Sequence, residues 1–257
     1  MGVRFAKMHG AGNDFVLIDD RDGTFPAERG ILAAIGARGT GVGCEGIILV
    51  QRSGRLDFRM KFFNPDGSEA EMCGNGARCV AAFAREIGAA KADRMRFETL
   101  AGDVGAEVLG PRLVKVEMPD PKDLRANFVN SGVPHCIVPV ADLAGADVAG
   151  EGRRIRYSEA FAPAGTNVDF VTYRVPHDVS IRTYERGVEA ETGACGTGAV
   201  AAALVGVAQH GMEFPVRVRT AKGYELTIDG EFDGTGFHGV TLTGPVERVF
   251  DGEIGLP

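Results

Sequence analysis

Short runs of apolar, β-branched and aromatic residues recur along the whole chain, separated by turns rich in Gly, Asn and Asp. Runs of this length and composition predict β-strands. In the first half we expect strands at residues 5–8, 15–19, 47–51, 57–63, 94–99, 104–109 and 113–118. Pro119 and Pro121 interrupt the pattern. Beyond them we expect strands at 127–129, 135–138, 168–174, 179–184, 216–220, 224–228 and 237–243.

Longer segments without strict alternation predict helices at residues 25–35, from about Gly74 to just before Gly88, and from Gly196 to about residue 210, with Gly211 after it. The last of these is apolar nearly all round, and a helix without a polar face must be buried on most sides. We therefore expect each half of the chain to wrap its strands around one central helix. A helix held between ordinary layers is the alternative.

One phrase occurs twice, about half a chain apart. Cys73-Gly-Asn-Gly-Ala77 and Cys195-Gly-Thr-Gly-Ala199 are each followed by an Ala-rich apolar run. In both halves, strands precede this element and further strands follow it. The economical interpretation is an internal duplication that places one thiol at the start of a helix in each half.

Composition and charge exclude several classes of protein. With 44% hydrophobic and 25% charged residues, the chain is typical of a soluble globular protein of one or two domains. A net charge of -7 without a Lys/Arg cluster argues against nucleic-acid binding. The charged start of the chain does not resemble a signal peptide, and the longest apolar run is too short to cross a bilayer. We expect a cytoplasmic protein without a membrane partner.

The cysteines and the Gly-rich loops bear on cofactors. Five cysteines without a secretion signal favour free thiols in a reducing compartment, and no Cys/His spacing indicates a metal site. Residues 41–46 match Gly-x-Gly-x-x-Gly, but a helix precedes this loop and a strand follows it, the reverse of a dinucleotide-binding unit. We therefore expect neither a metal nor an organic cofactor.

The repeated phrase is suited to acid–base chemistry. Its glycines leave backbone N–H groups uncovered, and a helix N-terminus stabilises a thiolate and lowers its pKa. The same N–H groups can bind a carboxylate. Two such thiols could remove a proton from one face of a carbon and return one to the other. Small buried cysteines of the core are the alternative, which we adopt for Cys79 and Cys136; Cys44 lies in a Gly-rich loop and is not assigned.

Polar residues in the turns beside the strands supply candidate substrate contacts. They are Asn13, Asn64, Asn167, Glu185 and Arg186. Asn is common in turns for backbone reasons, so each is also explained by turn geometry. His135 is a candidate general acid or base, but it cannot form a dyad with Cys136, because neighbouring strand residues point to opposite faces.

Together these residues resemble the diaminopimelate epimerase family through nearly the whole chain. The resemblance rests on Lys7-Met-His-Gly-Ala-Gly-Asn-Asp-Phe15, Asn64-Pro-Asp-Gly-Ser-Glu-Ala-Glu-Met-Cys-Gly-Asn-Gly-Ala-Arg78, Gly132-Val-Pro-His135, Gly165-Thr-Asn-Val-Asp-Phe170, Tyr184-Glu-Arg-Gly187 and Ala194-Cys-Gly-Thr-Gly-Ala199. The shorter Cys-Gly-x-Gly element alone would indicate only the wider group of cofactor-free racemases and isomerases.

The resemblance implies an α/β fold of two pseudo-symmetric domains, each a curled mixed sheet around a central helix, with the active site in the cleft between them. The N-terminal domain would comprise residues 1–118 and 246–257, the C-terminal domain residues 119–245. The chain would act as an isomerase, without a cofactor, on LL-2,6-diaminopimelate, giving the meso form for lysine and peptidoglycan synthesis. A second copy of the chain would complete a homodimer.

The same resemblance implies roles for individual residues. Cys73 and Cys195 would be the thiol/thiolate pair, assisted by His135 and Glu185. The substrate contacts would be Asn13, Asn64, Asn167, Glu185 and Arg186, with the two helix starts, Gly74, Asn75, Gly196 and Thr197, binding carboxylate.

Two positions depart from the family pattern and bear on the choice of substrate. Val133 stands where many members have Asn, and Glu45 stands where Asp is common. The alternatives are a related racemase or isomerase acting on another amino acid, and a catalytically silent protein of the same fold that binds an amino acid. A thiol hydrolase is a third alternative, although no orienting base lies in a diagnostic motif.

Overall fold

The structure is a computed structural model, which describes residues 2–256. Its contacts divide the chain into two compact units. One unit takes in the chain up to Val116 and again from Gly244 onward, and the other is continuous from Glu117 to Thr243. The expected domain limits, after residues 118 and 245, lie two residues from these, and the domain assignment stays a prediction.

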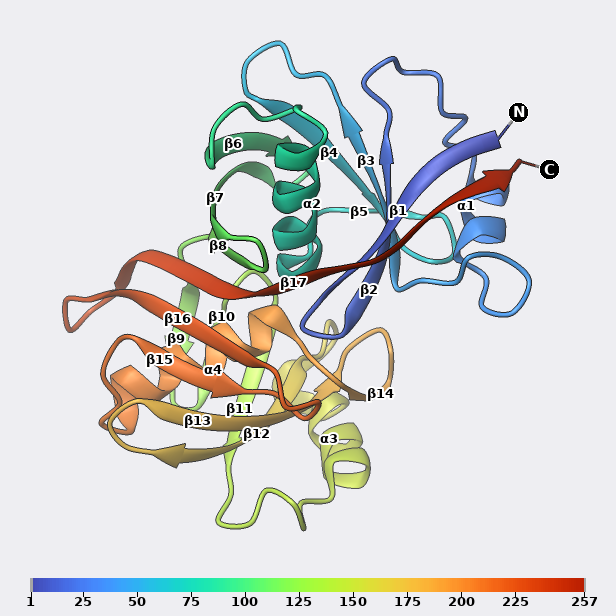
Figure 1. Cartoon of the computed structure of the whole chain (residues 1–257). Helices are drawn as coiled ribbons and strands as arrows, with labels where there is room; N and C mark the ends of the chain where they lie inside the picture. Colours follow the sequence, from blue (N-terminus) through green and yellow to red (C-terminus); the bar gives the residue numbers. More distant parts are fainter. Residues whose placement is uncertain (1, 257) are drawn as a thin grey trace. The chain divides into compact units, whose positions relative to one another are not determined.

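The first unit is a curled mixed sheet around one helix (Figure 1). Its elements are β1 (Gly2–Gly10), β2 (Asn13–Asp19), α1 (Arg29–Gly36), β3 (Gly46–Gln51), β4 (Phe58–Phe63), β5 (Glu69–Ala70), α2 (Gly74–Glu86), β6 (Arg94–Thr99), β7 (Gly102–Gly110), β8 (Leu113–Glu117) and the last part of β17 (Phe237–Gly255). From β1 the sheet continues through β2, β3, β4, β6, β7 and β8, with β2–β3 and β4–β6 parallel and the other pairs antiparallel. The helix α2 packs against β1, β2, β3 and β7.

The second unit repeats this pattern. Its elements are β9 (Lys122–Arg125), β10 (Phe128–Asn130), β11 (Pro134–Pro139), α3 (Val148–Arg156), a 3-10 turn (Glu159–Phe161), β12 (Asn167–Arg174), β13 (Asp178–Glu185), β14 (Ala190–Thr192), α4 (Gly196–Gln209), β15 (Val216–Arg219), β16 (Glu225–Phe232) and the first part of β17. From β10 the order is β11, β12, β13, β15, β16 and β17, with β11–β12 and β13–β15 parallel.

Strand orientations therefore run through the same series in both units, which confirms the predicted pseudo-symmetry. The helices occupy equivalent places in it: α1 and α3 follow the second strand of their series, and α2 and α4 each precede a parallel strand. The short strands β5 and β14 lead into α2 and α4 and pair with equivalent neighbours, β4 and β13.

The two Cys-Gly helices are buried as their apolar character predicts. In α2 every residue from Gly74 to Ala84 is buried, and in α4 every residue from Gly198 to Gly206. The helix α4 packs against β10, β11, β12, β13, β15 and β16, all in its own unit. Each unit is thus built around its helix, and the alternative of ordinary layers is wrong. Both helices end close to the predicted glycines, Gly88 and Gly211, whose φ values are 69° and 70°.

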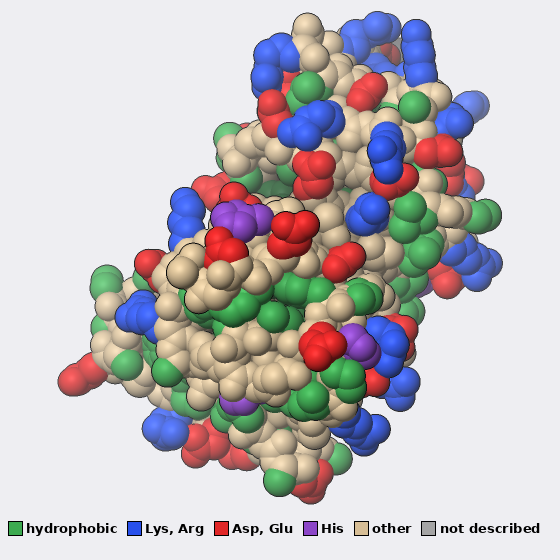
Figure 2. All heavy atoms as spheres, turned by 90° about the vertical axis from the view of Figure 1, so that its left-hand side faces the viewer, with side chains coloured by type: hydrophobic (Ala, Val, Ile, Leu, Met, Phe, Trp, Pro, Cys, Tyr) green, Lys and Arg blue, Asp and Glu red, His purple; other side chains and the backbone are tan. Residues whose placement is uncertain are grey.

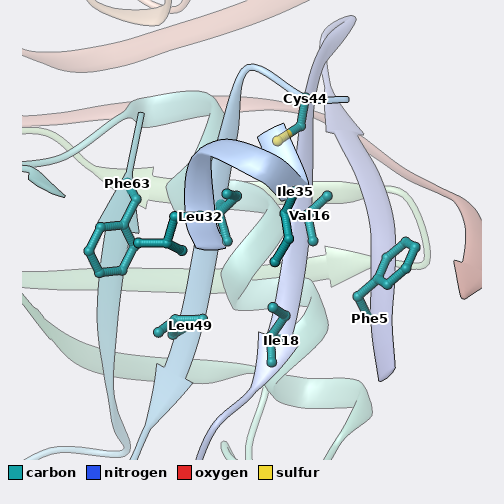
Figure 3. Close-up of a cluster of buried hydrophobic side chains, with 9 residues drawn as sticks. Phe5, Val16, Ile18, Leu32, Ile35, Cys44, Leu49 and Phe63 are labelled. Atoms are coloured by element: carbon teal, nitrogen blue, oxygen red, sulfur yellow. The ribbon is translucent and has the colours of Figure 1, made fainter. Parts of the chain in front are cut away.

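The first helix of the chain is shorter than predicted. It begins at Arg29 instead of residue 25, because Phe25 precedes Pro26 and is held outside the helix by a bond from its N–H to Asp20 Oδ1. Its buried face, Leu32 and Ile35, packs on β2 and β3 in a cluster with Phe5, Val16, Ile18, Cys44, Ile47, Leu49 and Phe63 (Figure 3).

The last strand is longer than predicted. It does not stop at Thr243 but continues to Gly255, pairing with β16 up to Thr243 and with β1 from Val246 onward. Pro245 lies where the strand changes partner, and there the lack of a backbone N–H in proline does not interrupt the pairing. Val246 N–H also donates to Arg112 O (3.0 Å), which brings this strand against the β7–β8 turn.

The surface carries both signs of charge. On the face in Figure 2, acidic and basic side chains are interspersed. None of the helices formed by residues 2–256 combines the length and apolar character needed to span a membrane.

Candidate active site

Each of the two repeated cysteines is the residue immediately before its helix. Cys73 and Cys195 have extended backbone dihedrals, and the first helical bonds are Ala77 N–H to Cys73 O (2.7 Å) and Ala199 N–H to Cys195 O (3.0 Å). Both residues are half-buried. Each thiol thus stands at the positive end of a helix dipole, beside first-turn N–H groups that have no partner within the helix.

In the second unit, a line of hydrogen bonds leads from a buried carboxylate to Cys195. Asp169 Oδ2 lies 2.6 Å from His135 Nδ1, His135 Nε2 lies 2.9 Å from Thr197 Oγ1, and Thr197 Oγ1 lies 3.4 Å from Cys195 Sγ. His135 and Asp169 are fully buried. Thr183 Oγ1 donates to the other oxygen of Asp169 (2.7 Å), so both carboxylate oxygens are engaged.

This line can hold or move a proton. A carboxylate only accepts, so we assign the Nδ1 proton of His135 to the bond with Asp169. With a neutral imidazole, Thr197 donates to Nε2 and accepts from the Cys195 S–H. With an imidazolium, Nε2 donates to Thr197, whose hydroxyl proton then turns toward the Cys195 thiolate. Transfer of one proton along the line interconverts the two states.

The ionisation of Cys195 differs from the expectation for a helix N-terminus. Burial raises the pKa of its thiol well above the ordinary value, and the nearby carboxylates of Glu185 and Asp169 raise it further. Hydrogen bonds from Thr197 and the Gly198 N–H act in the opposite direction but do not offset this. The predicted lowering of the pKa is therefore wrong for Cys195, because desolvation and two anions outweigh the helix dipole.

The remaining predicted residues of the second unit lie around this line. Asn167 is buried and opposite His135 in the β11–β12 pair. Its side chain donates to Pro134 O (3.1 Å) and accepts from the Arg186 N–H (2.8 Å). Glu185 ends β13 and accepts from Thr192 Oγ1 (2.7 Å). Asn167 therefore joins the start of β11 to the turn that carries Glu185 and Arg186.

In the first unit, the predicted residues lie on three different turns. Asn13 is half-buried at the start of β2, and Asn64 closes the turn after β4 through a bond from its Nδ2 to Ser68 Oγ (3.0 Å). Gly74 and Asn75 form the first turn of α2, where the Asn75 side chain is buried and accepts from Arg78 (2.8 Å). Asn64 and Asn75 thus use their side chains within the protein.

The two departures from the family pattern have separate surroundings. Glu45 accepts a bond from Arg38 (2.7 Å), which also binds Asp14 (2.8 Å). Asp14 pairs further with the buried Lys7 (2.5 Å). Burial opposes the charged form of Asp14, yet the bonds from Arg38 and Lys7 prevail and lower the pKa of its carboxyl. Val133 is half-buried, and its carbonyl accepts from the Ser131 N–H (3.2 Å).

The other cysteines lack the helix-start position. Cys79 is fully buried, and burial raises the pKa of its thiol to about 12. Cys44 is also in the core, where burial raises its pKa. Cys136 was expected in the core but is only half-buried, because it lies on the face of β11 opposite to His135. Across residues 2–256, no three His, Cys, Asp or Glu side chains are grouped as metal ligands.

Sequence reasoning missed two buried charges near the thiols. Asp169 had a detectable signal, since it is the one charged position within the apolar strand β12 before Arg174. Arg78 had a similar signal as the only charged residue of α2 before Arg85.

Solved structures define the class of fold. A phenazine biosynthesis PhzF-family protein of Bacillus anthracis superposes with a TM-score of 0.75 at 17% identity, covering 100% of both chains. A probable proline racemase of Agrobacterium radiobacter K84 gives a TM-score of 0.70 at 16% identity, covering 99% of this chain and 93% of the other. The chain therefore has the two-domain fold shared by the PhzF and proline racemase proteins.

Sequence relatives narrow this to a family. The profile of the family described as diaminopimelate epimerase matches residues 5–123 and 127–249. The diaminopimelate epimerase of Aquifex aeolicus (strain VF5) is 45% identical, with 98% of each chain covered. The chain belongs to the diaminopimelate epimerase family.

Proposed function

We propose that the chain is an isomerase that converts LL-2,6-diaminopimelate to meso-diaminopimelate without a cofactor, by proton transfer between two thiols. The observation that carries the proposal is the full-length match to this family together with a thiol at the start of both buried helices. The product would serve lysine and peptidoglycan synthesis.

The reaction balances within the protein and substrate. A thiolate removes the proton from the α-carbon, the electron pair remains on the carbon and delocalises into its carboxylate, and a thiol delivers a proton to the opposite face. One S–H bond forms, another breaks, and the two sulfurs exchange protonation states. The first-turn N–H groups of α2 and α4 would stabilise the charge developing on the carboxylate.

The other predicted residues would serve these two steps. His135, through Thr197, would hold or release the proton of Cys195, and Glu185 would keep that thiol protonated. Asn13, Asn64, Asn167 and Arg186 would form the substrate contacts, with the bonds of Asn64 and Asn167 fixing the turns around them.

A turnover assay with single-cysteine variants tests the proposal. Purified chain is incubated with LL-diaminopimelate in deuterated water under reducing conditions, without added cofactor. We expect meso product carrying one solvent deuterium at the inverted carbon. Cys73→Ala and Cys195→Ala should each lose at least about 1000-fold in turnover, since a two-base step fails without either base.

The matched control is Cys136→Ala, a half-buried cysteine that does not precede a helix. It should retain turnover close to that of the unmodified chain. Near-normal turnover in Cys73→Ala or Cys195→Ala would overturn the two-thiol mechanism. A panel of other amino acids, assayed for loss of optical activity, tests the alternative of a different substrate.

The proposal includes a cytoplasmic homodimer that binds a small molecule and neither nucleic acid nor membrane. All five cysteines are free thiols, which suits a reducing compartment. Sedimentation at several protein concentrations tests the dimer; a monomer throughout would contradict it.

A further inference from the structure

Arg78 is a charged side chain inside a buried helix. It lies one turn into α2, and its exposed fraction is 0%. Its Nη1 donates to Gly74 O (3.2 Å) and its Nη2 to Asn75 Oδ1 (2.8 Å), while Nε has no hydrogen-bond partner. The strand β1 passes very close: a Cβ on Gly10 would lie 3.4 Å from Nη2. Both acceptors are neutral, so the guanidinium charge is not neutralised by its own hydrogen bonds.

No carboxylate within residues 2–256 forms an ion pair with Arg78. The strands packed against α2 are β1, β2, β3 and β7. Their charged or titratable residues are Arg4, Lys7 and His9 on β1, Asp14 and Asp19 on β2, and Asp103 and Glu107 on β7. Every carboxylate among them is paired with another cation: Asp14 with Lys7 and Arg38, Asp19 with Arg21, Asp103 with Arg55, and Glu107 with Arg94 and Lys115.

The ionisable groups that interact favourably with Arg78 are two thiols. Burial lowers the pKa of the guanidinium to about 10, while the interactions with Cys79 and Cys73 raise it. The guanidinium therefore stays protonated at neutral pH. Cys79 stays a neutral thiol, since burial raises its pKa to about 12. Cys73 is half-buried and stands at the helix N-terminus, so it is the thiol that can ionise beside this cation.

The second copy of the repeat lacks this cation. The position equivalent to Arg78, five residues after the cysteine, is Val200, an apolar and buried residue. The charges that act on Cys195 are instead the carboxylates of Glu185 and Asp169. One thiol therefore has a buried cation as its neighbour and the other has two anions.

We infer that Arg78 is a positioning residue of the reaction proposed above, whose buried charge holds Cys73 as the thiolate, so that Cys73 is the base and Cys195 the acid when the resting enzyme meets its substrate. The assignment of base and acid roles rests on the proposed function. In the first half-reaction the α-proton passes to Cys73 sulfur, and the Cys195 S–H proton passes to the opposite face of the carbon.

Alkylation of the individual cysteines tests the assignment without turnover. The full chain is treated with iodoacetamide across a pH series, and the modification rate at each cysteine is read by peptide mass spectrometry. Only thiolates react, so the midpoint of each rate profile reports the ionisation of that thiol. In the unmodified chain we expect the Cys73 midpoint to lie below that of Cys195. The reverse order would overturn the inference.

Variants of Arg78 then separate charge from packing. Arg78→Met should raise the Cys73 midpoint by about 1–3 pH units, because a nearby opposite charge is lost. Arg78→Lys keeps the charge and should leave most of the midpoint shift in place. The Cys195 midpoint should move by less than the Cys73 midpoint in either variant, since the charges that act directly on Cys195 are those of Glu185 and Asp169. The acid limb of the pH profile of kcat/KM should move upward with Cys73 in Arg78→Met.

The matched control is Arg85→Met, which removes an exposed cation from the same helix, where it pairs with Asp93. It should leave the Cys73 midpoint unchanged. A folded Arg78→Met variant with an unchanged Cys73 midpoint would overturn the inference. If Arg78→Met does not fold, the order of midpoints in the unmodified chain and the Arg78→Lys profile still decide it. A low Cys73 midpoint in a chain that does not epimerise diaminopimelate would overturn the proposed function and leave the thiolate assignment supported.

Discussion

Residues in equivalent places of the two repeats have different neighbours, and in the proposed mechanism this difference would assign the acid and base roles. Cys73 and Cys195 share backbone conformation and helix position. The residue five positions after the cysteine, however, is Arg78 in one helix and Val200 in the other. An acid–base pair must begin with one proton between two sulfurs, and two identical surroundings would leave that proton unassigned. In the proposed mechanism the duplicated motif would supply the shared function, and single differences around it would assign the roles.

Thr197 is the residue whose removal most directly tests the proton line of the second unit. Thr197→Val keeps the shape of the side chain and removes the hydroxyl that links His135 Nε2 to Cys195 Sγ. We expect kcat to fall about 10- to 100-fold, because the thiol then loses its acid–base partner. Thr197→Ser, which restores a hydroxyl, should recover most of this loss. Steady-state kinetics measure it, and equal kcat in the Val and Ser variants would contradict the role.

Sequence alone indicated the two thiols and His135, but not the two buried charges that act on the thiols. The thiols were recognisable because the phrase is repeated, and repetition is visible in a string of letters. The pairing of Asp169 with His135 depends on the parallel register of β11 and β12, which the sequence does not specify. Asn64 illustrates the converse, since its side chain bonds to Ser68 within its own turn and the turn interpretation explains this bond.

At the scale of elements, the duplication contained more information than the apolar pattern. The helix α3 was not predicted, because Val148–Arg156 contains two internal glycines and three arginines and has no long apolar stripe. Its counterpart α1 occupies the same place in the other unit. Treating the repeat as a template would have predicted a helix between the second and third strands of the second series.

The first turn of α4 tolerates only glycine at one position. A Cβ on Gly198 would lie 2.6 Å from Asp169 Oδ1, a buried atom already bonded to Thr183. Gly198→Ala should therefore displace Asp169, destabilise the fold by about 1–3 kcal/mol and reduce turnover. Urea unfolding and steady-state kinetics measure the two effects.

The matched control for Gly198→Ala is the same substitution in another helix, Gly30→Ala in α1, where a Cβ would meet no atom within 4 Å. That change should be neutral or stabilise by up to about 1 kcal/mol. A Gly198→Ala variant as stable and active as the unmodified chain would show that Asp169 can move without consequence.

At the scale of the whole molecule, the fold class could be predicted from the sequence, but the length of the final strand could not. Gly and Pro commonly end strands, so Gly244 and Pro245 predict a strand that ends at residue 243. The strand continues because these two residues lie where it changes from β16 to β1 as its partner. The limits of the two domains and the predicted cleft between them remain predictions.

Truncation tests the contribution of this strand to the first unit. A chain ending at Pro245 lacks the part of β17 that pairs with β1, and with it the contact of Phe250 with Phe5 (ring centroids 5.9 Å apart). We expect hydrogen exchange to accelerate in β1 and β2 while β12 and β13 keep their protection. A chain ending at Gly255 is the control. Equal loss of protection in both units would contradict the prediction.

The divided first unit also sets an order for events during synthesis. The strand β1 leaves the ribosome before the second unit, but one of its two neighbours, the last part of β17, is made only after the second unit. The second unit is continuous, and all of it emerges before Gly244. We expect the second unit to fold first. At that stage the sheet of the first unit would still lack the last part of β17, which pairs with β1.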